Sequence, residues 1–142
     1  MIVVDASVGV KWFLDENGST VAAELLVAER EHISAPDIFA VEVAATLVRE
    51  ANVQKALASD MRLAVARLTS LFESAAISLV RLTPENLADT ADLAINLGHP
   101  LKDCIYLTLA MELGCPLITA DAKFAAKARG IYGDVRVLGG LA

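Results

Sequence analysis

The stretch MIVVDAS, residues 1–7, decides how the rest of the chain is expected to fold. Three β-favouring apolar residues lead directly into Asp5, which is the pattern of a short buried strand that ends in an acid. The pattern returns late in the chain, where Leu117-Ile118-Thr119 is followed by Asp121. Ligands of parallel α/β sheets bind in the crevice outside the carboxyl ends of the strands. We therefore expect Asp5 and Asp121 to face one crevice.

Between these two strands the chain alternates strand-like and helix-like stretches. Further strands are predicted near residues 33–35, 76–80 and 135–138, with helices over about 6–14, 19–30, 37–52, 59–73, 83–97, 102–113 and 122–129. Ser7 is expected to cap the first of these helices. Strands that alternate with helices are typical of a parallel sheet covered on both faces. The sequence thus predicts one α/β domain over residues 1–142, a three-layer α/β/α sandwich.

Composition narrows the class of protein. Of 142 residues, 56% are hydrophobic and only 5% aromatic, and the mean hydropathy of +0.54 is high for a soluble monomer. We interpret the excess as helix surface buried against a partner, with an efficient core as the alternative. No apolar run approaches the roughly 18 residues of a membrane span, and the N-terminus lacks the basic region of a signal peptide. Two cysteines, Cys104 and Cys115, are expected to be reduced thiols, which favours a cytoplasmic protein.

The net charge of −6 argues against a general nucleic-acid binder, because such domains are usually basic. The objection weakens if several of the acids hold divalent cations, since bound ions offset the repulsion between carboxylates and phosphate.

Two further carboxylates do not suit their surroundings. Glu42 lies within an apolar helical stretch and has no cation three or four residues away, and Asp103 begins another almost wholly apolar helix. Buried acids are normally paired or bound to metals. The alternatives are simple exposure of Glu42, a first-turn role for Asp103, and helix capping by Asp5 and Asp121. Together, the four acids suit a site of oxygen ligands for a hard cation such as Mg²⁺ or Mn²⁺.

The order of these motifs resembles that of PIN domains, specifically the VapC type of toxin. The resemblance rests on Ile2-Val3-Val4-Asp5-Ala6-Ser7, on Glu42, on Lys102-Asp103-Cys104-Ile105-Tyr106 and on Leu117-Ile118-Thr119-Ala120-Asp121. It implies a sheet of about five parallel strands and a metal-dependent endoribonuclease with Asp5, Glu42, Asp103 and Asp121 around Mg²⁺ or Mn²⁺. It further implies a homodimer, a small cognate antitoxin as inhibitor, and supporting roles for Ser7 and Thr119. In many relatives an Asp precedes the last Phe, whereas this chain has Lys123 before Phe124, a departure from the family pattern that bears on the number of metals bound.

The hypothesis for the mechanism is hydrolysis of an RNA phosphodiester by metal-activated water, which leaves 5′-phosphate and 3′-hydroxyl ends. Lys11, Lys102 and Lys123 flank the proposed site in sequence and are candidate phosphate contacts, with ordinary surface lysines as the alternative. The two histidines, His32 and His99, are interpreted as loop or surface residues without an acid–base partner.

Two other classes of function stay open at this point. One is a PIN-fold binding module without catalysis, against which the presence of all four acids argues. The other is a receiver-type or phosphotransfer α/β domain, which would need paired acids after the first strand and an acceptor Asp after a central one. Asp5 has no acidic neighbour, and the third strand ends in Val80-Arg81, so this second class fits poorly.

Overall fold

The fold is built on a sheet of five parallel strands. A computed structural model describes residues 1–139, so the last three residues of the expected domain lie outside the described part. The strands are β1 (Ile2–Val4), β2 (Ile33–Pro36), β3 (Ile77–Val80), β4 (Leu117–Thr119) and β5 (Val135–Val137). They lie in the order β3-β2-β1-β4-β5, and every neighbouring pair is parallel. The predicted α/β class and parallel sheet are confirmed.

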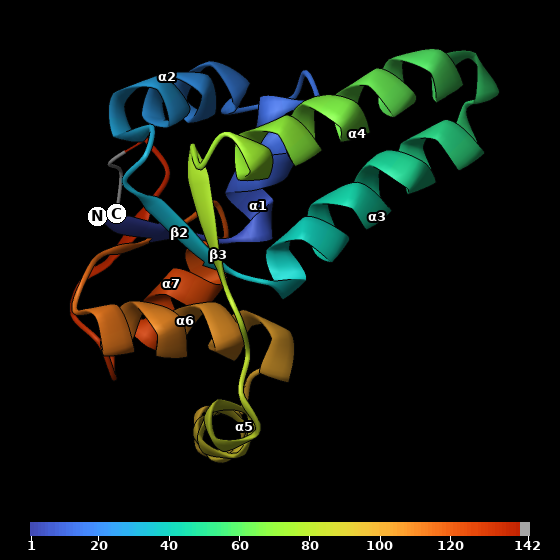
Figure 1. Cartoon of the computed structure of the whole chain (residues 1–142). Coiled ribbons are helices and arrows are strands. Elements are labelled where there is room, and N and C mark those ends of the chain that lie inside the picture. The colour runs from blue at the N-terminus through green and yellow to red at the C-terminus, as the bar shows by residue number, and fades with distance from the viewer. Residues whose placement is uncertain (140–142) are drawn as a thin grey trace.

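Helices cover both faces of this sheet. Their bounds are α1 (Ala6–Gly9), α2 (Ser19–Glu29), α3 (Ile38–Val53), α4 (Ala58–Glu73), α5 (Pro84–Leu97), α6 (Leu101–Leu113) and α7 (Ala122–Ala128). In Figure 1, α2 and α4 lie on one side of the strands and α5, α6 and α7 on the other. Helices α3 and α4 form a hairpin that projects beyond the sheet (Figure 1). The layers are those of the predicted α/β/α sandwich.

The strand order places a topological switch point between β1 and β4. From β1 the chain winds outward through β2 and β3, and it then returns to place β4 on the other side of β1. In open parallel sheets, the crevice outside the carboxyl ends of two such strands is the usual ligand site. Asp5 follows β1 directly and Asp121 follows β4 after one residue, so both acids stand at this crevice.

The expected cap of the first helix is wrong. Asp5 is the N-cap of α1, because its side chain accepts a hydrogen bond from the backbone amide of Ser7. Ser7 lies in the first turn instead, which frees its hydroxyl for other contacts. The helix is also shorter than predicted, since it ends at Gly9 and continues only as a 3₁₀ turn over Val10–Trp12.

Packing between α1 and α3 depends on a glycine. The Phe39 ring is fully buried and makes edge-to-face contacts with Trp12 and Phe72. A Cβ atom on Gly9 would lie 2.6 Å from this ring, which is closer than any carbon contact tolerates. Gly9 thus lets α1 lie against α3, and the partly buried Trp12 packs against the core.

The cysteines agree with the sequence analysis, because Cys104 and Cys115 are both buried free thiols. Within residues 1–139, no helix has the length and apolar character required to cross a membrane.

Candidate active site

Asp5 is the most buried acid at the switch point. Only 5% of its surface is exposed, and its Oδ1 accepts a hydrogen bond of 3.1 Å from the Ser7 amide and another from the Ser7 hydroxyl. Burial raises the pKa of Asp5 from 3.8 to about 6; the hydroxyls of Ser7 and Thr119 oppose this shift, and the charge of Asp103 adds to it. A cation placed beside Asp5 would therefore stabilise its ionised form, which burial disfavours.

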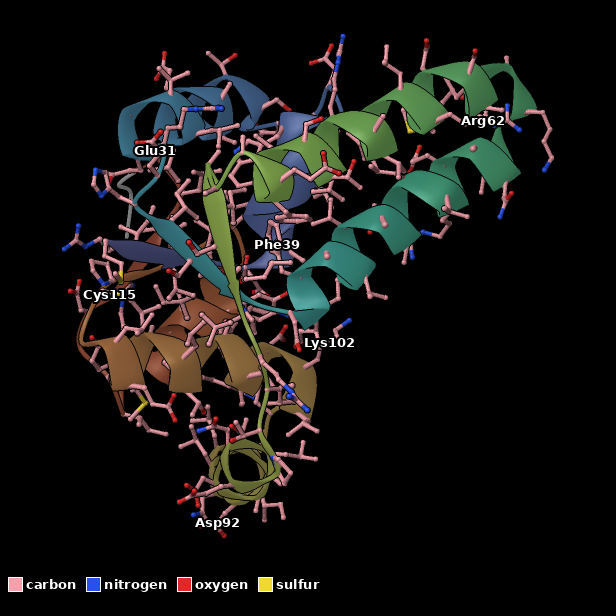
Figure 2. All side chains as sticks on the ribbon, viewed as in Figure 1. Glu31, Phe39, Arg62, Asp92, Lys102 and Cys115 are labelled. Carbon is pink, nitrogen blue, oxygen red and sulfur yellow. The ribbon has the colours of Figure 1, made fainter. Side chains whose placement is uncertain are left out.

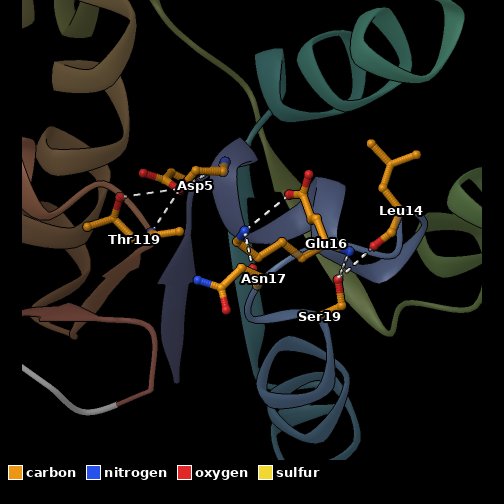
Figure 3. A network of polar contacts seen from close by, with 9 residues as sticks. Asp5, Leu14, Glu16, Asn17, Ser19 and Thr119 are labelled. Atoms are coloured by element: carbon orange, nitrogen blue, oxygen red, sulfur yellow. Dashed lines mark hydrogen bonds and ion pairs between the residues drawn. The ribbon is translucent and has the colours of Figure 1, made fainter. Parts of the chain in front are cut away.

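Ser7 and Thr119 connect the ends of β1 and β4 through hydrogen bonds, and their predicted support of a metal site stays a prediction. The Ser7 hydroxyl accepts from the Ala120 amide at 2.9 Å and lies 3.4 Å from the Thr119 hydroxyl. The Thr119 hydroxyl in turn accepts from the Asp121 amide at 3.1 Å. Figure 3 shows Asp5 and Thr119 close together at the ends of their strands. The two side chains hold the backbone after β4 in register with Asp5.

Glu42 reaches the same region from α3. The Tyr106 hydroxyl donates to Glu42 Oε1 at 3.2 Å, and Lys102 Nζ lies 3.9 Å from Oε2. Burial raises the pKa of Glu42, Lys102 and Tyr106 lower it, and the charge of Asp103 raises it again. The expectation that no cation on the same helix pairs with Glu42 holds, because the partner comes from α6 instead. Figure 2 shows Lys102 extending towards the first turns of α3.

Asp103 lies in the first turn of α6 and is partly exposed. Its Oδ2 is 2.7 Å from Nε2 of His99, four residues earlier in the chain. The interpretation of His99 as a histidine without an acidic partner is therefore wrong, although it does lie in a turn. The sequence carried a signal for this contact in the spacing of His99 and Asp103.

Three of the four predicted acids converge. The charge of Asp103 raises the pKa of both Asp5 and Glu42, so all three carboxylates lie within electrostatic reach of one another. Tyr106 lies among them: burial raises its pKa, and the charges of Glu42, Asp5 and Asp103 raise it further. These side chains come from β1, α3 and α6, which are far apart in the sequence.

Asp121 differs from the other three. It is exposed, and its Oδ1 accepts from the Phe124 amide at 3.0 Å, so it is the N-cap of α7. Asp5 also caps a helix, and the capping alternative is thus realised at both strand ends. Capping uses one oxygen of Asp121 and leaves the second for another ligand, so the predicted role of Asp121 at the metal stays a prediction.

The three candidate phosphate contacts lie in different surroundings. The amine of Lys11 is engaged by Glu16 Oε1 at 3.1 Å and by the Asn17 carbonyl at 2.7 Å, and its side chain is only 15% exposed. Figure 3 shows the contacts around Glu16 and Asn17 as a group separate from Asp5. Lys102 has a 64% exposed side chain beside Glu42, and Lys123 is exposed in the first turn of α7. Of the three lysines, Lys102 is the one that lies beside an acid of the candidate site.

A divalent cation suits the chemistry of this site. Within residues 1–139, no three Asp, Glu, His or Cys side chains stand close enough together to hold a metal ion as they are. The donors are nevertheless carboxylate oxygens, which hard cations prefer, and burial of Asp5 is unfavourable without a positive charge. Asp5, Glu42 and Asp103 would hold the ion, with Asp121 nearby.

Sequence reasoning missed the partners of two of these acids. Tyr106 appeared only as the last residue of a motif, with no role of its own, yet its hydroxyl donates to Glu42. Lys102 was expected to contact phosphate, and its approach to Glu42 was not foreseen. Neither contact leaves a local signal, because about sixty residues separate the partners.

This chain matches a known protein family in sequence and known protein structures in fold. The family model described as PIN domain matches residues 2–130. The structure of PAE2754 from Pyrobaculum aerophilum has a TM-score of 0.72 at 20% identity and covers 96% of this chain and 88% of its own. The sarcin-ricin loop cleaving toxin VapC20 of Mycobacterium tuberculosis gives 0.72 at 13% identity, covering 89% of this chain and 94% of its own.

A toxin–antitoxin complex from Klebsiella pneumoniae gives a TM-score of 0.67 at 16% identity, covering 99% of this chain and 100% of the matched chain. The comparison with curated proteins gives no significant match. The match to the PIN model excludes the receiver-type alternative and leaves the choice between a nuclease and a silent module.

Proposed function

Because this chain belongs to the PIN domain family, we propose that it is a metal-dependent endoribonuclease and the toxin of a cytoplasmic toxin–antitoxin pair. The observation that carries the proposal is the convergence of Asp5, Glu42 and Asp103 at the switch point of the sheet. Structural neighbours described as a cleaving toxin and as a toxin–antitoxin complex support the biological role.

The residues of the site have separate tasks in this proposal. Asp5, held by Ser7, is the fixed carboxylate to which Mg²⁺ or Mn²⁺ binds, and Glu42 and Asp103 complete the ligands. A bound divalent cation supplies activation of water and neutralisation of charge on the phosphodiester. The Lys102 amine lies beside Glu42 on an exposed side chain, so it can contact either that carboxylate or a substrate phosphate. In this proposal Lys102 and Lys123 contact phosphates of the RNA backbone, and their positive charge acts locally against the acidic net charge of the protein.

Cleavage of RNA by the purified protein tests this function. We expect fragments to appear with Mn²⁺ or Mg²⁺, and none with EDTA, because the carboxylates alone repel phosphate and activate no water. Mapping of the ends by mass spectrometry should find 5′-phosphates and 3′-hydroxyls. Fragments that carry 2′,3′-cyclic phosphates would exclude direct attack by water. Measurable metal binding without cleavage of any RNA in a total transcript pool would instead favour the silent module.

The α3–α4 hairpin offers a seat for the antitoxin. A cavity of about 430 Å³ lies between the two helices, and it is lined mostly by apolar side chains with Lys55 and Arg62 among them. Val48 lines the cavity and is 52% exposed. An amphipathic helix places its apolar face in such a groove, and the two cations favour acidic residues at its border. We propose that the antitoxin contributes this helix.

Substitution of Val48 by aspartate separates inhibition from catalysis. The added carboxylate lies in the apolar part of the groove, away from Asp5, so nuclease activity should be unchanged while the antitoxin binds at least about 10-fold more weakly, because an apolar contact would have to desolvate the charge. Titration of the cognate antitoxin against cleavage measures the effect. Equal inhibition of Val48→Asp and the wild type would place the antitoxin elsewhere.

A homodimer is the third part of the proposal. The α5 helix exposes Ile95 at 78%, and a shallow apolar surface of Ala91, Ala94, Ile95 and Leu101 extends from it to the start of α6. An interface between two copies of the chain would remove these apolar side chains from water.

A further inference from the structure

His99 lies in the turn between α5 and α6, where neighbouring groups fix both its backbone and its side chain. Gly98 ends α5 with a left-handed backbone (φ 65°), and the amide of His99 bonds to the Ala94 carbonyl at 3.1 Å. This arrangement satisfies the last carbonyls of α5 and fixes the backbone of His99. The side chain of His99 is only 12% exposed, so it points back into the protein.

Two helices clamp the imidazole ring. On one side its Nε2 lies 2.7 Å from Oδ2 of Asp103. On its face it stacks on the fully buried ring of Phe124, with centroids 4.8 Å apart and planes 27° from parallel. A second contact ties α7 to the same turn, because Lys127 Nζ donates to the Gly98 carbonyl at 3.2 Å. The ring therefore has one orientation, set by α7, in which Nε2 points at Asp103.

The hydrogen bond has a defined direction. An ionised carboxylate only accepts hydrogen bonds, so Nε2 must carry the proton. The contact engages one oxygen of Asp103 and holds the plane of the carboxylate, while Oδ1 remains for another ligand.

We infer that His99 is a positioning residue, which orients the carboxylate of Asp103 for a divalent cation; the inference rests on the proposed function. Residues that donate hydrogen bonds to metal ligands fix the orientation of those ligands, and their loss typically weakens metal affinity. The stacking of Phe124 on His99 extends this support to α7, whose N-cap is Asp121. His99 thereby links the helices that carry Asp103 and Asp121.

Calorimetric titration of Mn²⁺ into the folded full-length protein tests the role of His99. We expect His99→Ala to weaken Mn²⁺ binding by about 10- to 100-fold, as loss of such a supporting contact does. His99→Gln keeps an N–H donor at a similar distance from the backbone and should bind more tightly than His99→Ala. His32→Ala removes an exposed histidine and is the matched control, with wild-type affinity expected.

The outcomes separate the inference from the proposed function. Wild-type affinity in folded His99→Ala overturns the inference and leaves the nuclease proposal intact, whereas a wild-type protein that binds no Mn²⁺ overturns both. If His99→Ala fails to fold, the Gln variant and the ¹⁵N spectrum of the wild-type imidazole decide. That spectrum should show the proton on Nε2 of His99, and a proton on Nδ1 alone would contradict the inference.

Discussion

Replacement of Asp5 by asparagine is expected to reduce RNA cleavage by more than about 100-fold, because loss of a direct metal ligand exceeds the 10- to 100-fold effect of losing a supporting residue. The asparagine side chain would keep the shape of the original and can still cap α1, since Asn and Asp are equally good N-caps. The substitution removes the negative charge that attracts the cation. The measurement is the initial rate of cleavage at saturating Mn²⁺.

Asp92→Asn is the matched control for this substitution. Asp92 is exposed on α5, away from Lys102 (Figure 2), so the same change of charge should leave the cleavage rate unaltered. An Asp5→Asn protein that cleaves RNA at the wild-type rate would contradict the assignment of Asp5 to the metal.

The metal-free protein is expected to lose stability as the pH rises through the range from about 4 to 6. The pKa of Asp5 is about 6 in the folded protein against 3.8 ordinarily, so between these values the folded state binds more protons than the unfolded state. The free energy of unfolding then falls with pH, by up to about 3 kcal/mol over this window, since one pKa unit corresponds to about 1.4 kcal/mol. The raised pKa of Glu42 acts in the same direction.

Urea unfolding in EDTA at several pH values measures this effect. Asp5→Asn has no carboxyl to ionise at this position, so its stability should fall less between pH 4 and 6 and exceed that of the wild type at pH 7.5. Saturating Mn²⁺ at pH 7.5 should restore the wild type, by about 2.7 kcal/mol at 100 times the dissociation constant, and leave Asp5→Asn unchanged. If metal-free Asp5→Asn were less stable than the wild type at pH 7.5, burial of the Asp5 charge would not be the main unfavourable contribution.

The sequence predicted the framework of the site better than its contacts. Asp5 was recognisable because it follows three apolar strand residues, and parallel strands bring their carboxyl ends to one edge. Glu42 was recognisable because an acid within an apolar helix needs a partner. Its actual partners, Lys102 and Tyr106, come from a helix that begins nearly sixty residues later, and helical periodicity describes only neighbours on the same helix.

The role of Asp121 shows a different limit. An acid after a strand is equally suited to ligand binding and to capping the next helix, and the sequence does not distinguish the two. The structure shows the cap, with Asp121 exposed and bonded to the Phe124 amide. His99 and Asp103 have the spacing of helical neighbours, but His99 lies before Pro100, the N-cap of α6, so the two residues do not share a helix.

The contact of Gly9 with the Phe39 ring also sets how far apart two of the acids stand. Gly9 lies four residues after Asp5 on one element, and Phe39 lies three residues before Glu42 on the other. A methyl group added at Gly9 would collide with the Phe39 ring. The collision would increase the distance between the carboxylates of Asp5 and Glu42 without altering either side chain. Substitution at Gly9 is therefore a way to reduce the proposed activity from within the core. The surface that other proteins would recognise stays unchanged.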